Sequence, residues 1–116
     1  MLSSTERAKL ALENDAGLET IAVKIGREVR GSYQGLAGTF ASFAYSCLDK
    51  KAIPGFYEKG LVAEARLKEG GMRLVFSGKR TETELMGIMD IALENIGAFP
   101  GVQAGAKYMI DVKSKE

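Results

Sequence analysis

The chain has 116 residues, a formal net charge of +1, no histidine and one cysteine, Cys47. This charge balance gives no bulk argument for nucleic-acid or membrane binding, and the residue counts support neither an intrachain disulfide nor a zinc, haem or iron–sulfur site. No apolar run approaches the roughly 20 residues of a transmembrane helix. We therefore expect one soluble domain over residues 1–116, with no metal, no cofactor and no membrane contact.

The N-terminal residues Met-Leu-Ser-Ser-Thr-Glu lack the basic region and apolar segment of a secretory signal. Together with the single cysteine, this predicts a cytoplasmic location. Ser3 and Glu6 have the spacing of a capping box, in which each side chain satisfies a backbone amide at the start of a helix. The sequence therefore predicts a short helix from Ser3 to about Glu13, ended by a turn at residues 14–17.

The next segment supports two interpretations. Residues 19–25 alternate in strand period, with Ile21, Val23 and Ile25 on one face. The same segment also begins a series of mostly apolar residues that step by three and four as far as Cys47, as in one continuous helix. Because four glycines would each cost about 1 kcal/mol inside that helix, we favour a strand over 19–25, then a loop, then a helix over 32–49.

The helix expected over residues 32–49 carries two different faces. One is an apolar face made of Leu36, Phe40, Phe43 and Cys47. The other consists of small residues, which allow close approach of a partner. This second face is a candidate interface, and its members are Gly31, Gly35, Gly38, Ser42 and Ser46.

A β-hairpin is predicted over residues 61–76. Residues 61–67 and 72–76 alternate between apolar and polar, and Gly70 and Gly71 supply the backbone freedom that a hairpin turn over 68–71 needs. The register expected from a four-residue loop places Leu67 opposite Met72, Ala65 opposite Leu74 and Ala63 opposite Phe76.

An amphipathic helix is predicted over residues 81–96. Thr81 and Glu84 form a capping box at its start, and Gly97 stands where a C-terminal glycine belongs. Its apolar face consists of Leu85, Ile88, Met89, Ala92 and Ile96, and its polar face of Thr83, Gly87, Asp90 and Glu94. After an irregular loop, alternation over residues 108–113 predicts a last strand.

This order of elements is an α-helix followed by βαββαβ. It predicts an α+β fold of the ferredoxin-like kind, a two-layer sandwich with two helices on one face of a four-stranded antiparallel sheet. In the alternative, three N-terminal helices precede ββαβ. That layout resembles 4-vinyl-reductase and TRAPP-type ligand-binding or tethering domains, through Gly26-Arg-Glu-Val, the hairpin and the helix over 85–96. The cysteine-containing C-terminal hairpin of those domains is missing here.

The loop over residues 26–32 is the candidate ligand site. It would join a strand to a helix N-terminus, where backbone amides and the helix dipole attract anions, and two arginines would add positive charge. Its ligand-binding candidates are Gly26, Arg27, Arg30, Gly31 and Ser32. A P-loop is excluded, because Ser32 occupies the position of the required lysine. The simpler interpretation, which we prefer, is that these residues form a glycine-rich turn or a solvated helix face and bind no ligand.

The other residues with ionisable, nucleophilic or aromatic side chains are explained by structural roles. Asp90 and Glu94 lie one turn apart on a polar helix face and are expected to be a solvated pair, and Cys47 is expected to be buried. Aromatic side chains that could line a pocket or simply fill the core are Tyr33, Phe43, Tyr45 and Phe56. No catalytic residue is identified.

Lys50 and Lys51 could form a basic patch with residues 77–80. A ferredoxin-like sheet can bind RNA by stacking bases on exposed aromatics. Here the strand aromatics Phe76 and Tyr108 are expected on the core side, so we expect no nucleic-acid partner.

Three hypotheses about the function of the chain remain. The favoured hypothesis is a non-enzymatic, homo-oligomerising module that binds a partner or a small ligand. The second is a binding protein or enzyme for a small anion or phosphate ligand that uses residues 26–32, and the third is an RNA-binding ferredoxin-like domain. The sequence favours a non-enzymatic role and leaves catalysis open.

Overall fold

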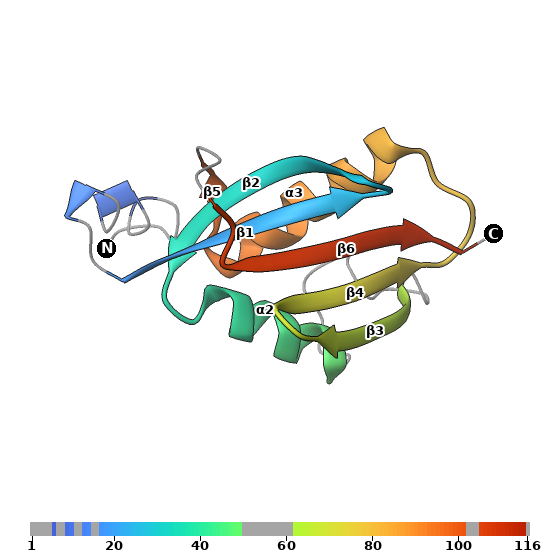
Figure 1. Cartoon of the computed structure of the whole chain (residues 1–116), viewed down its shortest axis with the longest axis horizontal. Helices are drawn as coiled ribbons and strands as arrows, with labels where there is room; N and C mark the ends of the chain where they lie inside the picture. The colour runs from blue at the N-terminus through green and yellow to red at the C-terminus, as the bar shows by residue number, and fades with distance from the viewer. Residues whose placement is uncertain are drawn as a thin grey trace.

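The chain forms an α+β structure in which two described helices pack on a six-stranded mixed sheet (Figure 1). The computed structural model describes residues 17–49, 62–101 and 105–115, together with positions 6, 9, 10, 13 and 14. In chain order, the elements are β1 (Leu18–Ile25), β2 (Glu28–Leu36), α2 (Thr39–Leu48), β3 (Val62–Lys68), β4 (Gly71–Phe76), α3 (Glu82–Ile96), β5 (Phe99–Pro100) and β6 (Tyr108–Ser114). The helix expected from Ser3 lies largely outside the described residues.

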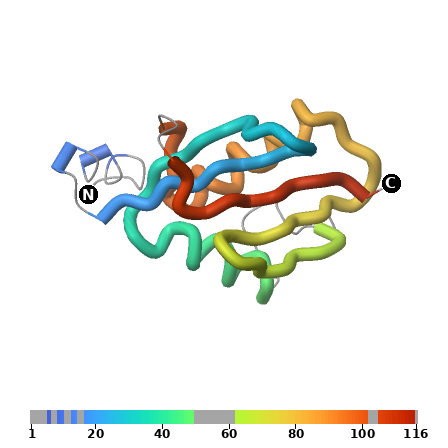
Figure 2. Tube along the Cα trace, in the orientation of Figure 1, coloured from blue at the N-terminus to red at the C-terminus, as the bar shows by residue number. Residues whose placement is uncertain are grey.

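The C-terminal strand β6 lies in the middle of the sheet. The strand order is β3-β4-β6-β1-β2-β5, so each hairpin, β1–β2 and β3–β4, stands on one side of β6 (Figure 2). β6 runs parallel to both β1 and β4, with Ile25 opposite Val112 and Phe76 opposite Ser114. The carboxyl ends of three strands therefore meet at one end of the sheet.

This arrangement differs from the ferredoxin-like one. The sheet has six strands in mixed orientation rather than four antiparallel strands, and the strand order is different. The strand expected over 19–25 is confirmed as β1, which removes the continuous-helix alternative and, with it, the layout of three N-terminal helices. The expected loop and helix start were wrong, because residues 28–36 form β2 and α2 begins only at Thr39.

Two glycines of β2 lie against the helices, and close packing requires glycine at one of them. A Cβ atom at Gly31 would stand 2.8 Å from the terminal methyl of Met86 on α3, and one at Gly35 would stand 2.7 Å from Thr39 Oγ1. At Gly31 the near atom is the end of the flexible Met86 side chain, which can move away. At Gly35 the near atoms include Thr39 Cβ at 2.9 Å, so glycine there lets the start of α2 approach the strand.

The β3–β4 hairpin has the expected register over most of its length. Leu67 faces Met72 and Ala65 faces Leu74, as predicted, but the turn is tighter, since Lys68 already pairs with Gly71. At the other end, Val62 rather than Ala63 faces Phe76, because the register shifts between Val62 and Glu64. A β-bulge of this kind is common on edge strands.

The core lies on one face of the sheet, between the strands and both described helices. Alternate strand residues such as Val23, Leu74 and Ile110 pack with Phe43 of α2 and Met89 of α3, and all five are fully buried. The expected core positions of Phe76 and Tyr108 are confirmed. The predicted amphipathic helix is also confirmed, with the Thr81–Glu84 capping box and Gly97 at φ 101° after its last turn.

Candidate functional site

The predicted anion loop is a hairpin turn followed by a strand. Gly26, at φ 66°, and Arg27 form the turn between β1 and β2, while Arg30, Gly31 and Ser32 belong to β2. No helix begins at this loop, so the amides and dipole expected there are absent. Arg30 is also engaged by two carboxylates, Glu28 at 3.0 Å and Glu82 at 2.7 Å.

The small residues of the predicted interface do not share one helix face. Gly31 and Gly35 lie in β2 and face the chain's own helices. Gly38 is the N-cap of α2, and only Ser42 and Ser46 lie within that helix. Ser42 is exposed and Ser46 is half-buried, so these two remain available to a partner.

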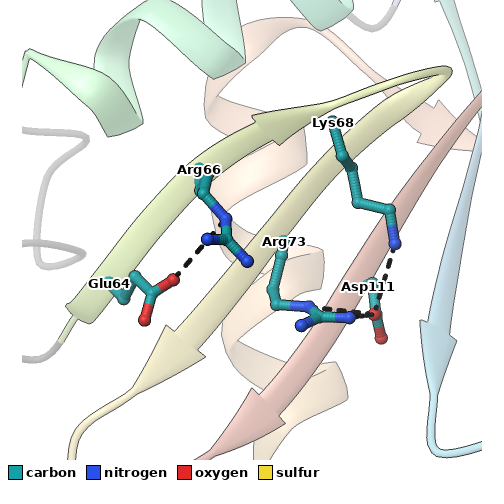
Figure 3. A network of polar contacts seen from close by, with 5 residues as sticks. All are labelled: Glu64, Arg66, Lys68, Arg73 and Asp111. Carbon is teal, nitrogen blue, oxygen red and sulfur yellow. Dashed lines mark hydrogen bonds and ion pairs between the residues drawn. The ribbon is translucent and has the colours of Figure 1, made fainter.

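The β3 edge is the most exposed strand of the described sheet. Among the described strands it pairs with β4 alone, and Glu64, Arg66 and Lys68 project from one side of it. Figure 3 shows Glu64 beside Arg66, with a 3.9 Å ion pair between them. Asp111, on central strand β6, accepts from Arg73 at 3.2 Å and pairs with Lys68 at 3.7 Å.

An apolar groove runs between α2 and the same edge strand. It has a volume of about 250 Å³ and is lined by apolar and aromatic side chains, among them Phe40, Tyr45, Leu67 and Tyr108. The rings of Phe40 and Tyr108 stack with their centroids 4.2 Å apart and form its floor. Tyr45 is 66% exposed and Leu67 is 52% exposed, unusually high for large apolar side chains.

A second pocket lies between β2, β5 and α3. Tyr33, Asp90 and Glu94 line it with Phe99 and two neighbours, around a volume of about 290 Å³. The buried Tyr33 hydroxyl donates to the Asp90 carboxylate. Partial burial, and to a smaller degree the neighbouring Glu94 charge, raises the pKa of Asp90. The sequence had identified the Asp90–Glu94 pair but could not place Tyr33 against it, because 57 residues separate Tyr33 from Asp90.

A third hollow is a crevice at the carboxyl ends of β1, β4 and β6. Its volume is about 760 Å³, and the cationic side chains on its lining are Arg80, Lys113 and Lys115. Of the predicted loop, only Gly26 reaches this crevice. Sequence reasoning had considered Arg80 within a basic patch. The patch itself cannot be placed, because Lys50 and Lys51 lie outside the described residues, as does Phe56 of the proposed aromatic pocket.

The cysteine, the possible metal ligands and the helix lengths of the described residues also bear on function. Cys47 is buried in the core, as expected, and no group of three potential metal ligands gathers there. Neither α2 nor α3 is long and apolar enough to cross a bilayer. The comparisons with known proteins add nothing: no family model, curated protein or solved structure gives a significant match to this chain.

Proposed function

We propose that this chain is a non-enzymatic assembly module that forms a homodimer through the exposed edge of β3. The observation that carries the proposal is the charge pattern of that edge, where Glu64 and Arg66 project from the same side of the strand with Ala65 between them. An edge strand presents a row of backbone N–H and C=O groups that can pair with another strand. A second copy of β3, running antiparallel, would satisfy these groups and continue the sheet.

Symmetry restricts how the two copies can align. A two-fold axis perpendicular to the sheet keeps every residue on its own face, so each side chain can stand opposite only residues of the same face. If the axis passes through Glu64 or through Arg66, that residue meets its own copy, and like charges face each other. If the axis passes through Ala65, Glu64 of each copy meets Arg66 of the other. Opposite charges in such cross-strand pairs are favourable, and like charges are not.

The apolar groove beside the edge adds to the same contact. Tyr45 and Leu67 flank it on the core side of the sheet, and Ser42 of the predicted interface lies one helical turn before Tyr45. In a dimer centred on Ala65, the two grooves would lie on either side of the axis, beneath the joined sheets. Full burial of one large apolar side chain contributes about 1.5–3 kcal/mol, so these residues would supply more of the affinity than the surface ion pairs.

Sedimentation velocity tests this proposal with two matched substitutions. We expect the wild-type protein to sediment as a dimer at roughly 100 μM, well above the micromolar dissociation constants of weak interfaces of standard size. Leu67→Lys places an ammonium group in the groove and should yield a monomer. Ile91→Lys is the control, because Ile91 is 61% exposed on α3 and lies outside the groove.

The proposal fails if the wild-type protein is monomeric at that concentration. It also fails if Ile91→Lys dissociates the dimer as completely as Leu67→Lys does. Far-ultraviolet circular dichroism and thermal melting of both variants separate loss of assembly from loss of folding. Both substituted side chains are more than half exposed, so we expect both variants to fold.

A further inference from the structure

The crevice at the carboxyl ends of β1, β4 and β6 has a position and a size that suit a small-molecule ligand. The ends of the three parallel strands are aligned by the pairs Ile25–Val112 and Phe76–Ser114, at the right-hand end of the sheet in Figure 1. Open sheets with parallel strands bind ligands outside this end, where the loops converge. The crevice volume of about 760 Å³ lies within the range of small-molecule sites.

The charge on the lining is unbalanced in favour of cations. Its two carboxylates each have an arginine partner outside the lining: Glu82 pairs with Arg30 at 2.7 Å, and Glu64 lies 3.9 Å from Arg66. The cations of the lining, Arg80, Lys113 and Lys115, form no ion pair with a carboxylate among the described residues, although Arg80 is near enough to Glu84 to help lower the pKa of that carboxyl. An incoming anion would therefore meet three positive groups at one place.

One cationic side chain is anchored at the crevice by a hydrogen bond, and the backbone of a second cationic residue is fixed there. Arg80 Nε donates to the Ser77 carbonyl at 3.1 Å, which holds the guanidinium beside the loop between β4 and α3. The backbone amide of Lys115 donates to the Phe76 carbonyl at 2.8 Å, which extends the β6 chain along β4. Anchored groups lose less conformational freedom when they bind a ligand.

The start of α3 does not itself offer an anion site. The amide of Glu84 donates to Thr81 Oγ1 at 3.2 Å, and the amide of Thr81 donates to Glu84 Oε1 at 3.1 Å. Those backbone donors are occupied, and Glu84 already places a negative charge there. The cationic side chains, rather than the helix dipole, would hold a ligand.

The lining also has an apolar part. Ala63 of β3 is exposed in the lining, and Ile25 of β1 and Val75 of β4 keep small accessible margins there, 6% and 8% of each residue. An inorganic ion would leave this surface uncovered. A ligand with an apolar group beside its charge would cover it and bring the hydrophobic contribution of that contact, about 25 cal/mol per Å² buried.

We propose that this crevice binds a small organic anion with an apolar portion, such as an aromatic carboxylate or phosphate monoester. Arg80, Lys113 and Lys115 hold the anionic group, and Ala63, Ile25 and Val75 contact the apolar portion. The site goes beyond the proposed dimer. Its cationic residues lie outside β3, although Ala63 and Glu64 of its lining belong to that strand, so the variants that test the site leave the dimer edge unchanged.

Titration of the ¹⁵N-labelled full chain, followed by two-dimensional NMR, tests the site with defined probes. Phenyl phosphate and benzoate should produce saturable shifts confined to residues 25–26, 63–64, 75, 77–85 and 112–115. Benzylamine and benzyl alcohol match the apolar portion without the negative charge, and inorganic phosphate matches the charge without the apolar portion. All three should bind at least roughly ten-fold more weakly, because each lacks one of the two interactions.

Variants decide whether the named residues hold the anion. Arg80→Ala and Lys113→Ala should each weaken phenyl phosphate binding roughly ten-fold, as expected for loss of a charge-assisted contact. Lys113 makes none of the loop contacts of Arg80, so its variant tests the site without disturbing that loop. Lys79→Ala is the control, because Lys79 is exposed, adjacent to Arg80 and outside the lining.

Three results would overturn the proposal. One is an equal response to benzylamine and phenyl phosphate, and another is equal affinity for inorganic phosphate and phenyl phosphate. The third is a loss of affinity in Lys79→Ala as large as that in Lys113→Ala. Because the dimer test uses residues 67 and 91, failure of one proposal leaves the other standing.

Discussion

The carboxylate of Glu19 on β1 accepts a hydrogen bond of 3.0 Å from the backbone amide of Phe40, in the first turn of α2. Its other oxygen accepts one of 3.0 Å from the amide of Gly38. Glu19 is buried, and its position favours a negative charge at the positive end of the helix dipole. A side chain of the sheet thereby fixes where α2 begins, and so helps to position the helix face that flanks β3.

Glu19→Ala should destabilise the protein, because it leaves two amides at the start of α2 without their acceptor. Hydrogen bonds to charged groups contribute about 1.5–3 kcal/mol each, so we expect the free energy of unfolding in urea to fall by about 3 kcal/mol. Glu19→Gln keeps one acceptor oxygen, so its free energy of unfolding should fall by less. Glu69→Ala, in the exposed β3–β4 turn, is the control. A Glu19→Ala loss as small as that of the control would contradict this role.

Gly71→Ala tests the parallel pairing of β4 with β6. A Cβ atom at Gly71 would stand 1.8 Å from the carbonyl oxygen of Met109 on β6, so the two strands must separate to admit a methyl group. Overpacking of this kind costs about 3 kcal/mol or more when backbone has to move. Guanidinium chloride unfolding measures the loss, and a variant as stable as the wild type would show that β4 and β6 do not approach this closely.

Gly87→Ala, on α3, should stabilise the protein rather than destabilise it. The position is exposed, and nothing lies within 4 Å of an added Cβ. Alanine is favoured over glycine inside a helix by about 1 kcal/mol, so the same unfolding experiment should show a gain of about that size. A loss would mean that Gly87 is not an exposed position within a regular helix.

The titration of Asp90 makes stability depend on pH. Burial and the Glu94 charge raise the pKa of Asp90 in the folded state, so the folded protein binds this proton more tightly than the unfolded chain does. The resulting stability is fully present below the unfolded pKa, which is about 4 for aspartate. It is lost as the pH rises through the folded pKa.

Comparison of the wild type with Asp90→Asn isolates this contribution. The free energy of unfolding of the wild type, relative to that of Asp90→Asn, should fall as the pH rises from about 4 towards neutrality. Glu94→Gln removes the smaller cause and should make that fall smaller, without abolishing it. Urea unfolding at a series of pH values measures both effects. A difference that stays constant with pH, or rises, would contradict the raised pKa.

Local signals were sufficient to predict α3 and the β3–β4 hairpin. The capping box of Thr81 and Glu84, the apolar spacing that follows and the glycine at 97 all act within a few residues of each other. The hairpin likewise depends on alternation and a glycine turn. The bulge before Glu64 was missed, because the alternation alone does not reveal an extra residue.

The rest of the fold and the candidate sites depend on contacts between residues that are far apart in the sequence. Gly35 looked like a break in a strand, but glycine is needed there because Thr39, at the start of α2, approaches the strand closely. The strand order depends on β6 entering between β1 and β4, which no local pattern specifies. The crevice cations come from the β4–α3 loop and β6, so the sequence could not bring them together. The sequence led us to expect an anion site at a helix N-terminus after residue 26. The helix N-terminus that faces a negative charge is instead that of α2, where the amides of Gly38 and Phe40 donate to the Glu19 carboxylate.

The most direct test of the β3-edge dimer is a charge exchange at residues 64 and 66, followed by light scattering. Arg66→Glu places carboxylates opposite each other twice across the axis and should weaken the dimer roughly 30-fold, from about 2 kcal/mol in the two pairs together. The double variant Glu64→Arg/Arg66→Glu restores both pairs and should restore the dimer. Lys24→Glu, on β1 and three strands from the edge, should leave the mass unchanged.

Light scattering of these proteins at equal concentration therefore separates the alternatives. We expect a dimer for the wild type, the double variant and Lys24→Glu, and a shift towards the monomer for Arg66→Glu alone. A wild-type monomer, or a double variant as dissociated as Arg66→Glu, would contradict pairing of two β3 strands about Ala65.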